Sequence, residues 1–353
     1  MDKVLKKMLD EEKISRSAYV KLIEGKVEND SEIESGLKIS VLISTYRRHA
    51  FLIQLLDSIK MQQYQNHEII IADDASDDDT ENAVKQYEAE NLDLNIIYFV
   101  NERNLGASES KKRAYLKASG DIIIFVDDDD YFIEPTYFSR LNQLYKNHSD
   151  CTMTIAAMIQ HFERDGVYKF LELNAPEVLS SREYLNGFMG RYRKPGVLTM
   201  SLNSTALKTI HYEELLCFND TSLFLFGLLG KGNVYTINQA VGVYRFHTGN
   251  ITGNTLPGFI IANLKSKEDI YQRAMKAGLL DDPKEWHYRN MSITAGYHLE
   301  GTQNRTKEDI LVWKWMKDHL DRKDYYRFVA RVIKARIRHK MYRKSTVSSL
   351  NNP

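Results

Sequence analysis

The sequence predicts an α/β fold with a mostly parallel central sheet flanked by helices and with an appended C-terminal helical region. Apolar β-forming runs alternate with segments of helical spacing between residues 38 and 126, a rhythm typical of parallel sheets. These runs end in polar or acidic residues, and after about residue 255 only helical spacing remains. We therefore expect a helical preface over 1–37, an α/β domain over 38–254 and a helical region over 255–353.

The individual elements follow from the spacing of their apolar residues. Continuous apolar runs predict strands over 38–46, 67–74, 94–100, 121–126, 151–162, 166–173 and 233–247. Apolar residues at i, i+3 and i+4 predict helices over 51–64, 76–90, 110–119 and 136–148. Ser76 or Asp77 is the expected N-cap of the second helix, and a capping box at Thr306–Asp309 predicts a later helix start. Residues 179–232 mix helix and loop.

Composition narrows the class of protein. The chain has 48 Lys and Arg against 48 Asp and Glu, so its net charge gives no general attraction to nucleic acid. It contains no apolar run of about 18 residues, and its amphipathic N-terminal stretch, which carries acids and no apolar core segment, does not resemble a secretory signal. Cys151 and Cys217 form no framework, which favours two free buried thiols in a reducing compartment. We expect a cytoplasmic protein with no nucleic-acid partner.

Four consecutive aspartates, Asp127 to Asp130, follow the buried run IIIFV directly. Carboxylates this close raise one another's pKa values and repel, which costs stability unless a cation binds them. Neither this run nor the acidic run at 73–79 has the Gly and Glu that an EF-hand needs at its sixth and twelfth positions. A D-x-D that holds Mg²⁺ or Mn²⁺ together with substrate phosphates fits better, and a solvated acidic turn is the alternative.

Polar clusters follow three of the predicted strands. They lie at 44–47, at Asp73-Asp74 and at Asp127 to Asp130. Ligands of open α/β sheets bind beyond the carboxyl ends of the strands. We therefore expect these three clusters to share one cleft.

Five ordered motifs resemble those of family 2 nucleotide-sugar glycosyltransferases of the GT-A fold, which is Rossmann-like. They are VLISTYRR, EIIIADDASDDDT, NERNLGASESKKRAYLKASGDIIIFVDDDD, FND and VYRFH, and the resemblance covers residues 38–250. It implies a metal-dependent inverting transferase, with Mn²⁺ or Mg²⁺ as cofactor. Such an enzyme moves a hexosyl or N-acetylhexosaminyl group from a UDP-sugar to a saccharide or lipid-linked acceptor in surface polysaccharide synthesis.

The resemblance also implies roles for residues at the first strand ends. Ser44, Tyr46 and Arg47 would line the nucleotide pocket, with Tyr46 stacked on the base, and Asp74 would accept the imide N–H of uracil. Asp127 matches the position that contacts the ribose.

Further along the chain, Asp129 matches the family position that binds the metal. Asp130 remains a second candidate, because a register slip of one residue cannot be seen among identical side chains. His247 is expected to bind the metal or the diphosphate. Arg245 is expected to steady a carboxylate or the phosphates.

Two further residues have a functional role implied by the resemblance and a purely structural alternative. Lys111 stands where the family often has Arg-Asn, and it would offer a point charge to the diphosphate; a solvated helix face is the alternative. Asp220, in FND, matches the general base that removes the proton of the acceptor hydroxyl. Its alternative is a plain N-cap.

The segment between Arg327 and Lys344 contains basic residues throughout and no acid. Apolar residues keep helical spacing through it: Tyr325, Phe328, Val329, Val332 and Ile333. This is a cationic amphipathic helix. It would pack on the catalytic domain or on a partner chain, or dock on anionic lipid at the inner face of the plasma membrane beside a lipid-linked acceptor. Homo-oligomerisation stays open.

Two other functions remain as alternatives. A nucleotidyltransferase that makes nucleotide-sugars shares this sheet and its metal aspartates, but normally has a Gly-rich loop after the first strand, and STYRRHAF contains no glycine. The second alternative is a non-catalytic carbohydrate- or partner-binding module. The presence together of Asp74, Asp129, Asp220 and His247 argues against it.

Overall fold

The computed structural model describes residues 36–250, 257–300 and 309–350, with side chains as far as residue 338. The chain divides after Thr248 into two compact units, which we describe separately as unit 1 and unit 2. Most of the predicted preface, the predicted boundary at 254/255 and most of the predicted capping box lie outside the described residues.

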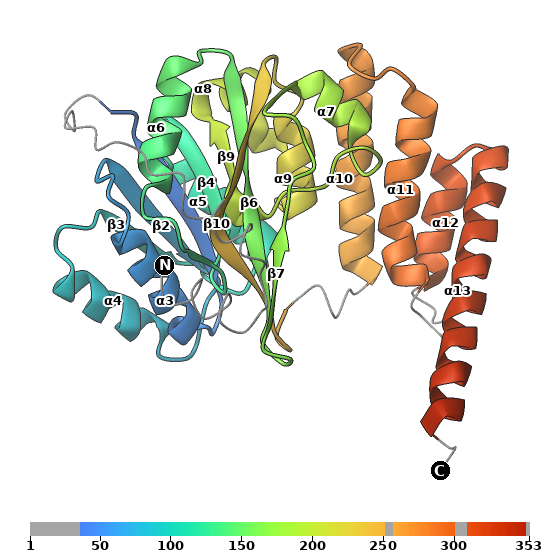
Figure 1. Cartoon of the computed structure of the whole chain (residues 1–353), viewed down its shortest axis with the longest axis horizontal. Coiled ribbons are helices and arrows are strands. Elements are labelled where there is room, and N and C mark those ends of the chain that lie inside the picture. Colours follow the sequence, from blue (N-terminus) through green and yellow to red (C-terminus); the bar gives the residue numbers. More distant parts are fainter. Residues whose placement is uncertain (1–35, 251–256, 301–308, 351–353) are drawn as a thin grey trace. The chain divides into compact units, whose positions relative to one another are not determined.

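A ten-stranded sheet forms the centre of unit 1 (Figure 1). Its strands are β1 (Ile39–Thr45), β2 (His67–Asp73), β3 (Ile96–Val100), β4 (Ile122–Asp127), β5 (Tyr131–Phe132), β6 (Cys151–Phe162), β7 (Val167–Leu171), β8 (Val178–Ser180), β9 (Met200–Asn203) and β10 (Asn233–Phe246). The main order is β3-β2-β1-β4-β9-β6-β10-β5. β1 to β4 pair in parallel, as the strand–helix rhythm predicts, whereas β9 lies antiparallel to both β4 and β6.

The helices of unit 1 connect and cover these strands. They are α3 (His49–Lys60), α4 (Thr80–Glu90), α5 (Ala107–Lys117), α6 (Tyr137–Asn147), α7 (Ser181–Gly187), α8 (Ser204–Thr209) and α9 (Asp220–Gly227). The predicted N-cap of α4 is wrong: the helix begins after Asp79, and not at Ser76 or Asp77. Ser76 belongs to the turn after β2 instead, because its N–H donates to the Asp73 carboxylate.

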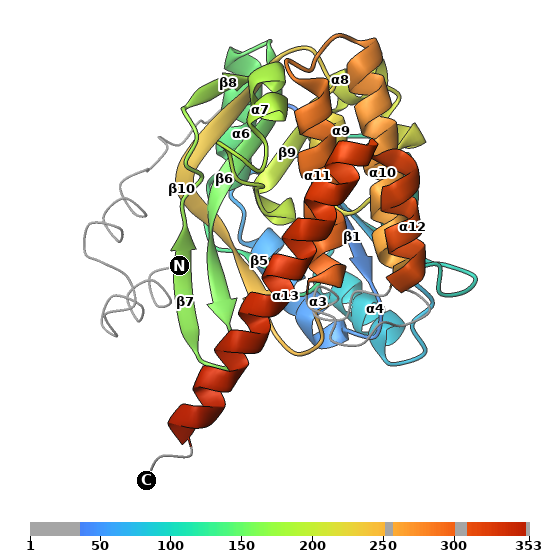
Figure 2. The same cartoon turned by 90° about the vertical axis from the view of Figure 1, so that its right-hand side faces the viewer.

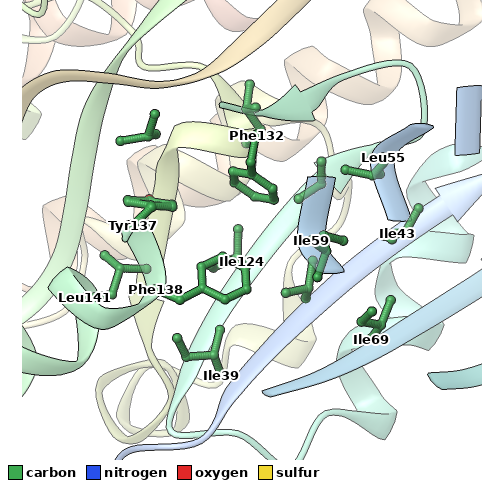
Figure 3. Packing of buried hydrophobic residues seen from close by; sticks show 14 of the residues in the cluster. Ile39, Ile43, Leu55, Ile59, Ile69, Ile124, Phe132, Tyr137, Phe138 and Leu141 are labelled. Atoms are coloured by element: carbon green, nitrogen blue, oxygen red, sulfur yellow. The ribbon is translucent and has the colours of Figure 1, made fainter. Parts of the chain in front are cut away.

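One face of the sheet packs against α3, α4 and α6. Side chains that point to this face alternate along β1, β2 and β4, as the pleat requires. Figure 3 shows part of this core, formed by Ile39, Ile43, Leu55, Ile59, Ile69, Ile124, Phe132, Tyr137, Phe138 and Leu141. On the opposite face, Phe125 of β4 contacts Tyr115 of α5 and Phe218. Burial on both faces fixes the strand ends, and with them the polar residues that follow.

Unit 2 is formed by α10 (Pro257–Lys276), α11 (Pro283–Leu299), α12 (Asp309–His319) and α13 (Arg322–Leu350). Its core includes Leu264, Met291 and Met316, and Phe328 and Val332 of α13 are buried among them. The predicted basic helix is therefore present, and part of its apolar face packs inside its own unit. Within the described residues, no helix combines the length and the hydropathy that crossing a bilayer would need.

Candidate functional site

The register of the parallel strands brings the predicted clusters to one edge of the sheet. Thr45, the last residue of β1, lies opposite Asp73 of β2. Its neighbour Ser44 lies opposite Asp127 of β4. A hydrogen bond also joins the ends of β1 and β4: Thr45 Oγ1 donates to the Asp128 carboxylate at 2.8 Å. Three sequence-distant segments thus meet where the sheet topology predicts.

The four aspartates do not form a solvated turn. Asp128, Asp129 and Asp130 are buried, and Asp127 is half-buried. The Arg48 guanidinium donates to Asp128 at 3.0 Å and to Asp129 at 2.8 Å. The alternative of an exposed acidic loop is therefore wrong.

His247 reaches this cluster from the segment after β10. Its Nε2 lies 3.0 Å from Asp129 Oδ2, and its ring lies on Phe51 of α3 with centroids 5.0 Å apart. His247 thus brings the segment after β10 to a carboxylate that lies 118 residues earlier in the sequence. Asp129 is the aspartate that the family resemblance predicts to bind the metal.

A second set of charges joins Asp127 to Asp220. Lys111 is buried, with its Nζ 2.6 Å from Asp127 and 3.7 Å from Asp220. Lys194 lies on the other side, 3.2 Å from Asp220. Because Lys111 is enclosed and paired, the alternative of a solvated helix face is wrong.

Asp220 is not the N-cap of α9. That position belongs to Asn219, whose side chain accepts the N–H groups of Thr221 and Ser222. Burial alone would raise the pKa of Asp220, but Lys194 and Lys111 lower it to about 2. The carboxylate is therefore ionised at neutral pH, and about a third of its side chain remains open to solvent.

Three of the aspartates form a candidate cation site. Asp127, Asp129 and Asp130 each offer a carboxylate oxygen, and these oxygens lie within 4.8 Å of one another. Asp130 Oδ1 accepts the Arg245 N–H at 3.0 Å, whereas Asp130 Oδ2 is buried with no hydrogen-bond partner among the described residues. Carboxylate oxygens suit Mg²⁺ and Mn²⁺. The residues therefore fit a divalent ion.

Burial and mutual repulsion shift the pKa values of these groups. Burial raises the pKa of Asp130 well above its usual value, and Asp129 and Asp127 raise it further. Burial also raises the pKa of Asp128 to about 7, although Arg48 opposes the shift. Keeping these carboxylates ionised costs folding free energy, which a bound cation would offset.

Replacing Asp130 by Asn is expected to stabilise the metal-free protein above neutral pH. The folded-state pKa of Asp130 is raised, so the folded protein holds a proton that the unfolded chain releases as pH rises from about 4. Wild-type stability therefore falls with rising pH, and Asn, which does not ionise, removes this contribution. In EDTA at about pH 8 we expect a melting temperature about 3 °C or more above wild type, with the two converging near pH 4.

Differential scanning calorimetry across pH would measure this effect. Asp77→Asn is the matched control, because Asp77 is an exposed acid at the same edge of the sheet. A lower melting temperature for Asp130→Asn at about pH 8 would contradict the electrostatic account of the cluster.

Asp74, the predicted uracil acceptor, follows β2 directly, and its side chain is buried against the loop before α5. Its carboxylate accepts the backbone N–H groups of Leu105 and Gly106 and the side-chain amide of Asn101. Gly106 has a φ of 86°, a conformation that glycine adopts without strain. Asp74 thus shapes the loop beside the strand ends.

The remaining predicted residues occupy different places. Ser44 is buried at the end of β1, and Tyr46 is partly exposed, with the Arg47 guanidinium 4.9 Å from its ring centre. Arg47 pairs with Asp77 at the surface. The Arg245 guanidinium lies over the rings of Phe51 and Tyr131, while its backbone N–H holds Asp130.

Sequence reasoning missed Arg48 and Lys194. The pair Arg47-Arg48 gives no sign of which residue turns inward; this depends on the left-handed conformation of Arg47, with a φ of 55°. Lys194 comes from a loop that has no periodic pattern. The nearest signal is Pro195, which favours an extended residue before it.

Part of the chain matches a known protein family. Residues 40–207 match the family model described as "Glycosyl transferase family 2". This segment of the chain belongs to glycosyl transferase family 2. The glycosyltransferase is similar to the "GalNAc(5)-diNAcBac-PP-undecaprenol beta-1,3-glucosyltransferase" of Campylobacter jejuni, with 26% identity over 61% of this chain and 67% of that protein.

A second curated relative and one solved structure are also similar to this chain. The glycosyltransferase is 27% identical to the "UDP-Glc:alpha-D-GlcNAc-diphosphoundecaprenol beta-1,3-glucosyltransferase WfaP" of Escherichia coli, over 61% of this chain and 80% of that one. Its fold is similar to that of S. aureus TarS 1–349, solved in complex with UDP-GlcNAc. The TM-score is 0.64 at 16% identity, and the match covers 88% of this chain and 92% of that one. The chain is therefore a glycosyltransferase of GT-A fold.

Proposed function

We propose that this enzyme is a metal-dependent inverting glycosyltransferase that moves a sugar from a UDP-sugar to a lipid-linked saccharide in surface polysaccharide synthesis. The observation that carries the proposal is the convergence of Asp127, Asp129, Asp130 and Asp220 at one edge of the sheet, with Lys111 between them. This edge is where open α/β sheets bind ligands. It combines a cation site for a diphosphate with a separate ionised carboxylate.

Asp220 is the proposed general base. The acceptor hydroxyl oxygen forms its bond to the anomeric carbon as the bond to the UDP oxygen breaks, and the hydroxyl proton passes to Asp220. One displacement of this kind inverts the anomeric centre. Its products are the glycoside and UDP. Partial exposure of the carboxylate lets an acceptor approach it from solvent.

Lys111 and the aspartates are proposed to bind the diphosphate of the nucleotide-sugar donor. Asp129 and Asp130, with Asp127 and His247 beside them, would hold Mn²⁺ or Mg²⁺, which supplies positive charge to the leaving diphosphate. Lys111 adds a second positive charge at the same place, and its enclosure strengthens the attraction to a phosphate. Tyr46, partly exposed at the end of β1, is the proposed stacking surface for the base.

The names of the relatives support the choice of substrates. The relative from C. jejuni and the relative from E. coli are both named as glucosyltransferases acting on undecaprenol diphosphate-linked saccharides, and the second is named for UDP-Glc. We therefore propose a UDP-linked donor, an acceptor carried on a membrane lipid, and a location at the cytoplasmic face of that membrane.

Calorimetric binding of UDP, GDP, CMP and dTDP to the wild type tests this proposal. With Mn²⁺ present we expect UDP to bind at least ~10-fold more tightly than the other nucleotides, and EDTA to weaken UDP binding at least ~10-fold. A screen of UDP-sugars for hydrolysis would then identify the donor. If no nucleotide binds in a metal-dependent way, the proposal is wrong.

A further inference from the structure

Helix α13 carries an apolar stripe that the core of unit 2 does not use. Tyr326, Ile333 and Ile337 are 59%, 52% and 54% exposed. Their spacing of seven and four residues places them on one face of the helix. Phe328 and Val332 lie on a different face and are buried. The folded unit therefore leaves about half of each stripe side chain in water.

Exposed cations flank this stripe. At 100° per residue, Lys323, Lys334 and Arg338 follow one edge of it, and Arg322 lies at the other. Lys334 and Arg338 are exposed, and the structure shows no ion pair for either within the described side chains. Their charge is available to an external partner.

Other cations of the same helix have internal roles. Arg327 pairs with Glu285 and Arg331 with Glu300, so both connect α13 to α11 and the residues that follow it. The sole acid between 322 and 344 is Asp324, which is buried, against ten Lys and Arg. The helix therefore separates the cations that hold the fold from those that face outward.

The helix also extends beyond its own bundle. Figure 2 shows the C-terminal half of α13 continuing past the ends of α10, α11 and α12. The sequence of this half continues with Lys340, Arg343 and Lys344, and contains no acid as far as residue 353. Tyr326 and Ile333 therefore lie on the outward face of the half of α13 that packs in unit 2, and Ile337 lies where the projecting half begins.

We propose that the surface formed by Tyr326, Ile333, Ile337, Lys334 and Arg338 docks on a bilayer that contains anionic phospholipid. A narrow apolar stripe with a row of cations along one edge matches the boundary between acyl chains and negatively charged headgroups. A protein partner would need a broader apolar patch than three side chains provide. The inference deepens the proposed function, because it brings the enzyme to the surface where a lipid-linked acceptor lies.

Co-sedimentation of the full chain with vesicles tests this surface. Vesicles of phosphatidylcholine are compared with vesicles containing about one third phosphatidylglycerol. We expect the wild type to bind the anionic vesicles at least ~10-fold more strongly, and high salt to remove most of this preference. Ile333→Ser/Ile337→Ser and Lys334→Glu/Arg338→Glu should each weaken binding at least ~10-fold.

Matched controls lie in unit 1. Leu116→Ser removes a 62% exposed helical leucine, and Lys146→Glu/Lys208→Glu reverses two exposed cations. Both controls should bind vesicles as the wild type does. Circular dichroism of every variant confirms that the helices remain, since the substituted side chains are exposed.

Several outcomes would overturn the inference. Absence of vesicle binding, or equal binding by wild type and both α13 double variants, rejects the surface. A dimer that Ile333→Ser/Ile337→Ser dissociates would assign the stripe to a second copy of the chain. Binding of UDP, measured in parallel without vesicles, separates failure of this inference from failure of the proposed function.

Discussion

Replacing Asp220 by Asn is expected to lower the rate of sugar transfer by about 10²–10⁴-fold, while donor binding stays within a few-fold of wild type. Asn has nearly the same shape but cannot accept the proton of the acceptor hydroxyl. The start of α9 should survive, because the N-cap is Asn219 and not Asp220. Initial rates of UDP release with an acceptor, together with calorimetric binding of UDP, measure the two effects separately.

Asp77→Asn is a suitable control for this variant. It also neutralises a carboxylate near the strand ends, but Asp77 is exposed and pairs with Arg47 at the surface. The control should keep wild-type turnover. An Asp220→Asn enzyme with wild-type turnover would remove Asp220 from the chemistry, and one with equally weakened UDP binding would assign it to the donor instead.

Replacing Asp129 by Ala is expected to remove metal-dependent binding of UDP. Asp129 is buried and contacts both Arg48 and His247, so its loss removes one of three carboxylates from the candidate cation site and the acidic partner of His247. We expect UDP affinity in Mn²⁺ to fall at least ~10-fold, to the level that wild type shows in EDTA. Calorimetric titration of both proteins in Mn²⁺ and in EDTA measures this difference.

A control variant tests whether the loss of metal-dependent UDP binding is specific to Asp129. Asp77→Ala removes an exposed acid from the same sheet edge, and it should retain the full effect of Mn²⁺ on UDP binding. Metal-dependent binding of UDP by Asp129→Ala would show that other groups hold the ion. Comparable melting temperatures of the variant and the wild type would exclude loss of folding as the cause.

Much of the fold could be predicted because it follows from local patterns. Apolar runs mark β1, β2 and β4, and the rule for open α/β sheets places their polar ends at one edge. The meeting of Thr45, Asp73 and Asp128 follows from that rule without any coordinates. The N-cap of α4 could not be chosen this way, because Ser76 and Asp77 to Asp79 are all acceptable caps and turn geometry decides among them.

Other parts depend on information that is not local. Arg48 points toward the aspartates because Arg47 adopts a left-handed backbone conformation. This conformation costs energy, and the composition of the sequence does not indicate it. β9 has only four residues and lies antiparallel between β4 and β6, so its existence depends on its partners. Lys194 reaches Asp220 through tertiary packing of a loop. Each of these is decided by the assembled fold.

The pairing of the aspartates with Arg48 and Lys111 has a consequence for the order in which ligands are held. In the free protein these side chains already act as counterions for Asp127, Asp128 and Asp129. A cation that bound alone would compete with them for Asp127 and Asp129, leaving Lys111 with Asp220 and Arg48 with Asp128. In the proposed enzyme a nucleotide diphosphate would offer Arg48 and Lys111 new partners, so cation and nucleotide would favour each other's binding reciprocally. If the proposed function holds, these internal counterions would therefore make the binding of cation and nucleotide cooperative.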